Sequence, residues 1–573
     1  MGSNSCYYRA VAVDYDGTLT FAPSPSVEVL EAVRAARATG LKIVLVTGRI
    51  LSELRADFPD LDGEFDGIVA ENGAVIWTVG SGERVLVSPV GADLEETLML
   101  NGVPHRRGRV ILATESRYDR LVLRAISAAR GDYQLAYNRD ALMILPTGVS
   151  KGRGLFEVLG ELGISHHSVV ALGDAENDHS LVEFCELGVA VANAVPSLQL
   201  RADIVLHESD GQGVVELLQG PLLRGDIRVR PKRWQVEVGA GPGGVPVMVP
   251  GSQTNLLIVG GSGSGKSYLA GLLVERLSAK GYCTCVLDPE GDHVTLANLR
   301  GVIAVGGASG MPTPERLAEL LTQRFGSVVI DMSRLSAAEK LRQAETYVKA
   351  LQTLRRETGL PHWIVIDEAP QLMGMAGAID ACGPASQGFC LVTHEPGTLP
   401  RSILDQMDLV FAVPGGEQLL AELQGVPAAR GVEHGTDRLR RGEALLFDAG
   451  ERVRFTMASR HRPHVRHWHK YLSNRLPPSG QFFFRTPKGP TGGVVGNVAE
   501  FHHELERASE EVLRHHLMHG DFSRWLEQTL QDRALAVTVG LIESGYQNGT
   551  LPDLEGVRQQ LIDAVEQRYG VPS

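Results

Sequence analysis

The sequence predicts an α/β protein with two doubly wound parallel-sheet domains, followed by a small, mainly helical domain. Three observations support this fold class. Residues 7–222 alternate short apolar strands with amphipathic helices, and the same alternation resumes over residues 254–457. From residue 497 onward, apolar residues recur at helical spacing. Strands and helices that alternate in this way form parallel sheets with helices on both faces.

The individual elements follow in order along the chain. In the first domain, we expect a strand at 9–17, a helix at 27–40 and a second strand at 41–49. In the second domain, the helix 267–281 lies among apolar strands, which are expected at 255–261, 283–289, 327–333, 363–369, 389–395 and 409–415. The third region predicts helices at 497–520, 521–544 and 554–570.

The composition is that of an ordinary globular protein and not of a generally basic one. A length of 573 residues suggests roughly three or four domains, and a hydrophobic content of 43% can supply each with a core. The formal net charge of -13 argues against a surface that coats nucleic acid or an anionic membrane. It leaves room for a local basic groove.

The cysteines and the apolar runs bear on the compartment. The six cysteines are scattered and form no CxxC pair, which argues against a disulfide framework or a zinc knuckle and favours a reducing compartment. No apolar run approaches the roughly 18 residues that span a bilayer, and the first residues do not form a signal peptide. We therefore expect a cytoplasmic protein without a membrane partner.

Two carboxylates lie where the first strand ends. Asp14 and Asp16 stand two residues apart, and parallel sheets bind their ligands at the carboxyl ends of the strands. One carboxylate can attack phosphorus and form an aspartyl phosphate, and a second can protonate the leaving oxygen and then activate water. Taken alone, the pair would also fit an acidic loop after a strand.

Three later segments supply the other parts of a phosphoryl-transfer site. Thr47 and Gly48 end the second strand and offer a hydroxyl for a phosphate. Lys151 opens a helix and offers a cation, and residues 173–178 end a strand with further acidic groups. Four pieces in this order make an acidic loop the weaker interpretation.

Together these segments resemble the haloacid dehalogenase superfamily, in its Cof-type branch of phosphatases, over about residues 8–220. The resemblance implies a Rossmann-like fold in which Asp14 is the nucleophile and Asp16 the general acid and base. It also implies that Thr47 and Lys151 hold the phosphoryl group. The Mg²⁺ ligands that it implies are Asp14, Asp16 (through its backbone carbonyl) and Asp174. The supporting residues that it implies are Gly48, Asn177 and Asp178.

In this branch, a cap domain that selects the substrate is inserted between the second and third motifs. Here we expect a small cap at about 80–145 within a phosphatase domain at 1–222. Several arginines of this region could meet a second anionic group of the substrate, although solvated surface arginines are the simpler interpretation of each one. They are Arg106, Arg107, Arg109 and Arg117.

A glycine-rich loop follows the first strand of the second domain. The segment GGSGSGKS fits the pattern G-x-x-x-x-G-K-S/T between an apolar strand and a helix. In such a loop the backbone N–H groups cradle phosphates, the lysine reaches the β- and γ-phosphates, and the final hydroxyl binds Mg²⁺. The residues expected to bind ATP, as a substrate, are Gly260, Gly261, Ser262, Gly263, Ser264, Gly265, Lys266 and Ser267.

An acidic pair ends a later strand of the same domain. Asp367 follows four apolar residues and is suited to orient Mg²⁺ through water, which makes it part of the expected ATP site. Glu368 is suited to activate the attacking water. An adjacent glutamate favours hydrolysis, because a kinase must exclude water and admit an acceptor hydroxyl.

Residues 228–457 resemble the HerA/FtsK-like ATPases, a branch of motors that includes DNA translocases and conjugation ATPases. The segments that carry the resemblance are 260–267, 286–293, 327–333, 364–373 and 389–414. It implies a P-loop NTPase domain, here at 223–460, in a homo-oligomer, typically a hexameric ring, whose sites are completed by a neighbouring subunit.

The second domain departs from that family in two places. The chain has Thr393-His394 where many members have Thr-Gln, so His394 is expected to support the site. The segment 381–389 lacks the arginine that is usual before that strand. The candidates for an arginine that acts on a neighbour's site are Arg401, Arg430, Arg438, Arg440 and Arg441.

A connector rich in arginine, histidine and turn residues is expected at 461–496. Its histidines are poorly spaced for zinc and have no cysteine beside them; they are His461, His464, His467 and His469. We favour a basic connector over a strip that faces phosphate or nucleic acid, and either over a metal site. Residues 497–573 resemble an uncharacterised helical domain of bacterial proteins, and we assign its Phe501, Phe522 and Trp525 to the core.

The motifs predict a bifunctional enzyme that pairs a Mg²⁺-dependent phosphomonoester phosphatase with an ATP hydrolase. The expected phosphatase substrate is a phosphorylated small molecule or a nucleic-acid end. One alternative is a nucleic-acid processing enzyme, either a DNA or RNA motor or a polynucleotide kinase-phosphatase that trims terminal phosphates. Another is a nucleotide-gated oligomeric scaffold that regulates the phosphatase.

Overall fold

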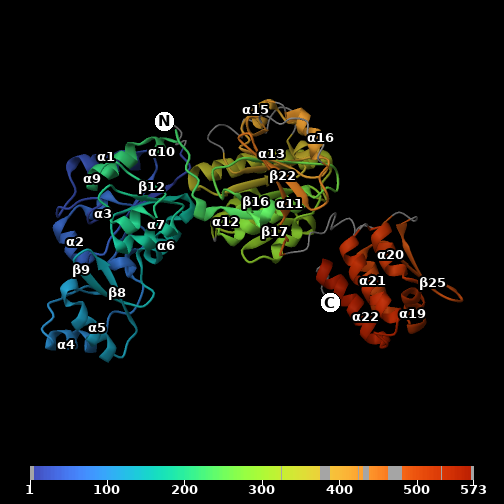
Figure 1. The fold of residues 1–573 in the computed structure, drawn as a ribbon, viewed down its shortest axis with the longest axis horizontal. Helices are drawn as coiled ribbons and strands as arrows, with labels where there is room; N and C mark the ends of the chain where they lie inside the picture. Colours follow the sequence, from blue (N-terminus) through green and yellow to red (C-terminus); the bar gives the residue numbers. More distant parts are fainter. Residues whose placement is uncertain are drawn as a thin grey trace.

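The computed structural model describes residues 6–323, 325–373, 387–423, 425–429, 438–461, 476, 480–530 and 532–569. Figure 1 shows an α/β unit in blue and teal, a second α/β unit in green to orange, and a helical unit in red. The predicted fold class is confirmed, because each α/β unit holds a mainly parallel sheet. Among the helices of the described residues, none has the length and apolar content needed to span a membrane.

The first unit is organised around the buried strand β1. Its sheet has the order β12-β11-β10-β1-β2-β3-β4-β5, and it is parallel from β12 to β3 and antiparallel at β4 and β5. The strands are β1 (Ala10–Asp14), β2 (Lys42–Val46), β3 (Gly67–Ala70), β4 (Val75–Thr78), β5 (Gly82–Val85), β10 (Val169–Gly173), β11 (Leu187–Ala190) and β12 (Ile204–Val205).

Helices cover both faces of this sheet, and one of them brings Lys151 to its carboxyl edge. They are α1 (Val27–Ala38), α2 (Leu51–Asp57), α3 (Leu61–Glu64), α6 (Lys151–Leu162), α7 (His179–Phe184), α8 (Pro196–Gln199), α9 (Asp210–Gln219) and α10 (Pro221–Arg224). The Ser150 hydroxyl caps α6 by accepting the N–H of Arg153 at 3.2 Å. This cap fixes Lys151 at the first position of the helix.

A smaller α/β insert separates β5 from α6 and projects below the first unit in Figure 1. Its antiparallel sheet has the order β6-β7-β9-β8, with β6 (Arg106–Arg107), β7 (Leu112–Glu115), β8 (Tyr133–Asn138) and β9 (Ala141–Pro146). The helices α4 (Ala92–Leu100) and α5 (Asp119–Ala128) pack on this sheet around a core of their own.

The second unit has an eleven-stranded sheet of order β14-β13-β23-β22-β21-β15-β20-β19-β16-β18-β17. It is parallel from β21 to β17, and the other edge is antiparallel. The strands are β13 (Val236–Ala240), β14 (Pro246–Val249), β15 (Leu256–Val259), β16 (Thr284–Asp288), β17 (Val302–Gly306), β18 (Ser327–Asp331), β19 (Trp363–Ile366), β20 (Phe389–Thr393), β21 (Leu409–Ala412), β22 (Glu443–Asp448) and β23 (Glu451–Met457).

Two hydrophobic cores lie on opposite faces of this second sheet. Alternate residues of β15 enter different cores: Leu257 and Val259 enter one, and Leu256 and Ile258 the other. The helices are α11 (Lys266–Ala279), α12 (Pro314–Thr322), α13 (Ala337–Thr358), α14 (Ala369–Leu372), α15 (Arg401–Leu404) and α16 (Gly416–Leu419).

The third unit combines a hairpin with five helices. They are β24 (Phe482–Thr486), β25 (Gly489–Val495), α18 (Val498–Arg507), α19 (Glu510–His519), α20 (Asp521–Gln528), α21 (Arg533–Gln547) and α22 (Leu554–Tyr569). The hairpin lies inside the range 461–496, where the sequence predicts a connector. It joins the helical unit because Phe482 and Phe484 pack against Phe501, Phe522 and Trp525, which are buried as expected.

The two α/β units meet at the amino ends of their parallel strands. Glu186, just before β11, accepts hydrogen bonds from Ser252 at 2.5 Å and from Tyr282 at 2.8 Å. Its Oε2 also lies 2.7 Å from Nδ1 of His167, whose Nε2 lies 2.9 Å from the carbonyl oxygen of Lys280. The carboxyl edges of the two sheets therefore lie at the ends that are remote from this interface.

Candidate functional site

A buried lysine joins two carboxylates at the carboxyl edge of the first sheet. Lys151 Nζ lies 2.5 Å from Oδ1 of Asp14 and 2.6 Å from Oδ1 of Asp178, and the three side chains are at most 1% exposed. Burial alone would lower the pKa of Lys151, but the two carboxylates outweigh it and raise that pKa. The lysine is therefore a permanent cation beside Asp14.

A third carboxylate completes this cluster. Asp174 follows β10, is fully buried, and accepts the Thr18 hydroxyl at 3.2 Å. Asp178 braces the turn, because its Oδ2 accepts the backbone N–H groups of Asp174 and Ala175, each at 3.0 Å. Burial and the charge of Asp178 raise the pKa of both Asp14 and Asp174. These raised pKa values mean that the cluster favours additional positive charge.

The residues present fit a divalent cation. Asp14, Asp174 and Asp178 each offer a carboxylate oxygen, and these oxygens lie within 4.8 Å of one another. The buried Oδ2 of Asp14 has no hydrogen-bond partner in the described part of the chain. A Cβ added at Gly17 would lie 2.4 Å from Oδ2 of Asp174, so only glycine allows this close approach. An oxygen-only ligand set is what Mg²⁺ prefers.

The remaining predicted residues of the first site lie around this cluster. Thr47 is fully buried at the end of β2, and its hydroxyl accepts the N–H of Arg49 at 3.1 Å. A Cβ at Gly48 would lie 2.9 Å from Sδ of Met143, so this glycine lets the insert approach the site. Asp16 is 34% exposed and accepts two hydrogen bonds from Arg49, at 2.6 and 2.9 Å.

Two asparagines support the loops of the site. Asn177 donates to Oδ1 of Asn72 at 3.2 Å, which links the turn after β10 to the turn after β3. Asn193 donates to the carbonyl oxygen of Gly17 at 2.8 Å and accepts the N–H of Asp210 at 2.7 Å. The sequence motifs did not predict Asn193 as a supporting residue.

The arginines of the insert are placed differently from the sequence-based hypothesis. The four candidates pair with glutamates on the surface; the pairs are Arg106–Glu53, Arg107–Glu95, Arg109–Glu83 and Arg117–Glu115. Instead Arg139, which sequence reasoning missed, forms an ion pair with Asp174. No local motif marks Arg139, because its role depends on how the insert folds over the core.

The glycine-rich loop joins β15 to α11 as its pattern requires. Gly263 and Gly265 have φ values of 72° and 108°, so the loop needs glycine at these positions. Nζ of Lys266 donates to the carbonyl oxygen of Gly261 at 3.0 Å, and the hydroxyl of Ser264 donates to the same oxygen at 2.7 Å. Lys266 is only 5% exposed at the amino end of α11.

Asp367 lies on the neighbouring part of the sheet and contacts this loop. The strand β20 lies between β15 and β19, so Asp367 and the loop approach from its two sides. Burial would raise the pKa of Asp367, but hydrogen bonds from His293, at 2.8 Å, and from Ser267 lower it. Asp367 therefore stays ionised beside the hydroxyl that the motif assigns to Mg²⁺.

Glu368 and His394 lie together at the ends of β19 and β20. Nδ1 of His394 is 2.9 Å from Oε2 of Glu368, so the predicted supporting residue contacts the predicted base. Glu368 adopts a left-handed backbone conformation, with φ at 45°. A non-glycine residue in this conformation carries strain, and such strain is common where a side chain must be aimed.

His293 is a supporting residue that sequence reasoning missed. It is fully buried, and its N–H donates to Oδ2 of Asp288 at 2.7 Å while its ring reaches Asp367. Burial raises the pKa of Asp288 to about 6. Burial would lower the pKa of His293, but Asp367 and Asp288 raise it. The segment 286–293 carries part of the resemblance to the HerA/FtsK-like ATPases, but the sequence alone implies no role for His293.

Some predicted residues lie outside the described part of the chain. They are Arg430, His464, His467 and His469. His461 is described, and its Nε2 lies 2.8 Å from a guanidinium nitrogen of Arg276. Arg401 pairs with Asp405 at 2.9 Å on α15, and the remaining arginine candidates lie on the approach to β22.

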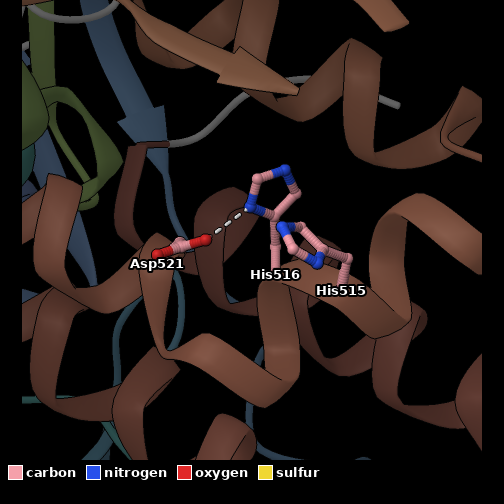
Figure 2. A group of neighbouring side chains, drawn as sticks. All are labelled: His515, His516 and Asp521. Atoms are coloured by element: carbon pink, nitrogen blue, oxygen red, sulfur yellow. Dashed lines mark hydrogen bonds and ion pairs between the residues drawn. The ribbon is translucent and has the colours of Figure 1, made fainter. Parts of the chain in front are cut away.

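A second group of possible metal ligands lies in the third unit. Figure 2 shows His516 and Asp521 pointing toward one another, with His515 beside them. Nδ1 of His516 is 2.8 Å from Asp521, and its Nε2 accepts the backbone N–H of Arg485 at 3.0 Å. Both ring nitrogens of His516 are therefore engaged, so this group is a structural hydrogen-bond network rather than a metal site.

Comparison with known families gives two matches along the chain. Residues 11–100 and 110–218 match the model of haloacid dehalogenase-like hydrolases. Residues 247–358 match the model of the central domain of the helicase HerA. The first match includes the cluster around Asp14, and the second includes the glycine-rich loop and His293.

Curated relatives align with the first unit over nearly their whole length. The phosphoglycolate phosphatase of Methanothermobacter thermautotrophicus is 33% identical over 220 residues, which are 37% of this chain and 97% of that protein. The phosphoglycolate phosphatase of Archaeoglobus fulgidus is 32% identical over 221 residues, which are 37% of this chain and 96% of that protein.

Among solved structures, a haloacid dehalogenase-like hydrolase from Bacteroides thetaiotaomicron is similar to the same part. It is 20% identical with a TM-score of 0.33, and the match covers 37% of this chain and 98% of that one.

Proposed function

The chain belongs to the haloacid dehalogenase-like hydrolases through residues 11–100 and 110–218 and carries a HerA central domain at 247–358, and from this premise we propose a bifunctional Mg²⁺-dependent enzyme. The first unit would hydrolyse phosphomonoesters, and the second would hydrolyse ATP. The observation that carries the phosphatase proposal is the buried Asp14, whose Oδ2 is unpartnered in the described residues while Lys151 holds its other oxygen.

The phosphatase reaction follows from these side chains in two steps. Oδ2 of Asp14 attacks phosphorus, and the bond from phosphorus to the leaving oxygen breaks as Asp16 protonates that oxygen. Asp16 then takes a proton from a water molecule, which attacks the aspartyl phosphate and releases inorganic phosphate and free Asp14. Lys151 and Thr47 hold the phosphoryl oxygens. Arg49 donates to Asp16 and so fixes the position of its carboxylate.

A divalent cation held by Asp14, Asp174 and the backbone carbonyl of Asp16, with Asp178 beside it, would offset the repulsion between the nucleophile and the substrate phosphate. The fit rests on the three clustered carboxylates, two of which share the buried cation Lys151. We propose Mg²⁺, because all the donors are oxygen atoms.

A small phosphorylated carboxylic acid is the first substrate to test. The two relatives that align over nearly their whole length are named phosphoglycolate phosphatase. The first unit of this chain has the same extent, including an insert over the catalytic edge. We therefore propose phosphoglycolate, or an acid of similar size, as the substrate class.

The second unit is proposed to hydrolyse ATP. Lys266 and the loop N–H groups would bind the phosphates, and Ser267 and Asp367 would orient Mg²⁺. Glu368 would accept a proton from the attacking water, with His394 fixing its carboxylate. Stimulation of this turnover by DNA or RNA would favour the motor alternative, and transfer of the γ-phosphate to a 5′-hydroxyl end would favour the kinase alternative.

Ring formation belongs to the same proposal. Cleavage of the γ-phosphate needs positive charge beyond Lys266 and Mg²⁺, and an arginine from a neighbouring subunit commonly supplies it. Arg401, Arg438, Arg440 and Arg441 are the described candidates. Light scattering with an ATP analogue and Mg²⁺ tests the ring, and a monomer with undiminished ATP turnover would rule out both the ring and the arginine in trans.

The experiment that tests the two activities compares Asp14→Asn with the wild type. An amide cannot form the aspartyl phosphate, so release of phosphate from phosphoglycolate should fall by at least about a thousandfold. ATP turnover should stay within about twofold, because the two sites lie at remote ends of their sheets. A variant that kept most of its phosphatase rate would show that Asp14 is not the nucleophile.

A further inference from the structure

The tip of one hairpin in the insert carries an arginine over the catalytic edge. The strands β8 and β9 pair with Asn138 opposite Ala141, so Arg139 and Asp140 form the turn between them. Arg139 has a left-handed backbone, with φ at 50°. A two-residue hairpin turn needs such a backbone at its first central residue, and it costs a residue other than glycine about 1 kcal/mol.

The Arg139 side chain crosses from the insert to the core. Its guanidinium forms an ion pair with Asp174, lies 3.4 Å from the carbonyl oxygen of Asn193, and stacks 5.5 Å above the ring of Phe21. The side chain is 43% exposed, whereas Asp174 is fully buried. The guanidinium therefore stands at the mouth of the site, with one side toward the carboxylates and the other toward solvent.

The position of the insert that brings Arg139 here is fixed by the core. Glu71, which is fully buried after β3, accepts backbone N–H groups of the insert from Arg109 at 2.8 Å, Val110 at 2.8 Å and Ile111 at 3.2 Å. Met143 of β9 packs where Gly48 leaves space. The reach of Arg139 is thus part of the fold and not a chance surface contact.

We propose that Arg139 binds the carboxylate of a small phosphorylated acid while its phosphoryl group sits on Asp14. The proposal rests on the phosphatase function proposed above. A guanidinium binds a planar carboxylate through a pair of parallel N–H donors, and Asp174 shows that a carboxylate fits against Arg139. With a divalent cation held by Asp174, that carboxylate would be a weaker partner for the guanidinium, and the substrate carboxylate would take its place.

The short distance between Asp14 and the carboxylate that pairs with Arg139 limits the size of the substrate. The carboxylate oxygen that Asp174 offers lies within 4.8 Å of that of Asp14, and the same carboxylate carries the ion pair with Arg139. A substrate that spans from Asp14 to the guanidinium therefore has its carboxylate only a few bonds from phosphorus. The four insert arginines suggested by the sequence pair with glutamates, whereas Arg139 pairs with a carboxylate of the site, so Arg139 is the specificity residue that the geometry supports.

The kinetic test compares two substrates of equal carbon-chain length in the full-length protein. Phosphoglycolate carries the carboxylate, and 2-hydroxyethyl phosphate carries a hydroxyl in its place. Arg139→Ala should raise the KM for phosphoglycolate by about tenfold to a hundredfold, as expected for a lost charge-assisted pair. The KM for 2-hydroxyethyl phosphate should change by less than about threefold, and Arg139→Lys should recover part of the loss.

A binding test separates this inference from the proposed reaction. In the Asp14→Asn background, calorimetry with Mg²⁺ measures phosphoglycolate affinity without turnover, and adding Arg139→Ala should weaken it at least about tenfold. Arg124→Ala, an exposed position on α5 of the same insert, is the matched control. Equal losses on both substrates, or unchanged phosphoglycolate affinity, would overturn the role of Arg139. Binding that depends on Arg139 without any wild-type turnover would overturn the phosphatase proposal instead.

Discussion

Lys266 and Glu368 have different roles in the proposed ATP reaction: Lys266 binds the phosphates and Glu368 accepts a proton from water. Their substitutions should therefore separate ATP binding from ATP hydrolysis. Lys266→Ala removes a cation from the phosphate loop and should weaken ATP binding by at least about tenfold. Glu368→Gln keeps the loop intact but cannot accept a proton from water, so it should bind ATP normally and hydrolyse it at least about a hundredfold more slowly. Fluorescent-nucleotide titration and phosphate release measure the two effects.

The control for this pair is Glu395→Gln, an exposed neighbour that also lies near His394. It should leave both ATP binding and turnover close to the wild-type values. Equal loss of ATP binding in the Lys266 and Glu368 variants would contradict the division of labour between them.

For single residues, the sequence predicted the site where a motif lies at the end of a strand or the start of a helix. Asp14, Lys151 and Asp178 converge because each is tied to the end of a strand or the start of a helix, and parallel strands end at one edge. Arg139 and His293 could not be assigned in this way. Their roles depend on side chains that reach across elements, and no spacing along the chain encodes such a reach.

At the scale of elements, a buried ion pair fixes the segment that leaves the second unit. Nε of Arg460 donates to Glu275 on α11 at 2.9 Å, the N–H of His461 donates to the same carboxylate at 2.8 Å, and both charged side chains are at most 1% exposed. Burial lowers the pKa of Arg460, although Glu275 opposes this effect. The end of the second unit is thus held on the helix that begins at Lys266.

Breaking this pair from one side should destabilise the second unit strongly. Glu275→Leu or Arg460→Met leaves an unpaired buried charge, so each should lower the free energy of unfolding by about 3–5 kcal/mol. The double variant should lose less unfolding free energy than the sum of the two single losses, because it leaves no unpaired charge buried. Denaturant unfolding measures this cycle, with the exposed Arg316→Ala as a control that should change stability by less than about 1 kcal/mol. Strictly additive losses would exclude a coupled pair.

The C-terminal hairpin shows why one element was not predicted. Phe482 and Phe484 are buried and Phe483 is half exposed, which is the alternation of a strand. The run is only a few residues long and lies among prolines and glycines, so turn signals dominate its local sequence. Its strand state depends on the aromatic core of α18, α19 and α20, which no window of the hairpin contains.

At the scale of the whole molecule, the interface between the α/β units carries histidines that favour neutral or alkaline pH. Burial, helped by the charge of His167, lowers the pKa of His166 to about 3. Burial also lowers the pKa of His362 well below its usual value. The unfolded chain takes up these protons near pH 6.5 and the folded chain does not, so stability falls as the pH drops below about 6.5.

This pH dependence should be partly removed by His166→Phe. The ring of His166 stacks on Phe184 at 4.8 Å, so a phenyl ring can replace it without a charge to bury. Between pH 7.5 and 5.5, we expect the variant to lose about 1 kcal/mol less stability than the wild type, which corresponds to roughly 2–4 °C in Tm. Calorimetry at both pH values measures the difference. An identical loss in the two proteins would mean that His166 does not contribute.

The interface itself should matter for the assembly of the two units more than for either reaction. Glu186→Ala leaves His167, Ser252 and Tyr282 without their shared acceptor, so we expect the free energy of unfolding to fall by about 3–5 kcal/mol and the segment 225–231 to become sensitive to proteolysis. The surface variant Glu183→Ala is the control and should behave like the wild type.

Phosphatase kinetics complete this last test, because Asp14 lies at the carboxyl end of β1 and Glu186 lies before the amino end of β11. In the folded Glu186→Ala variant below its Tm, the KM for the phosphatase substrate should stay within about twofold of the wild type. An increase of the KM by tenfold or more without unfolding would show that the interface affects the catalytic edge through the sheet. The docked units would then act as one coupled enzyme, whereas an unchanged KM makes the interface a rigid joint between two sites that work apart.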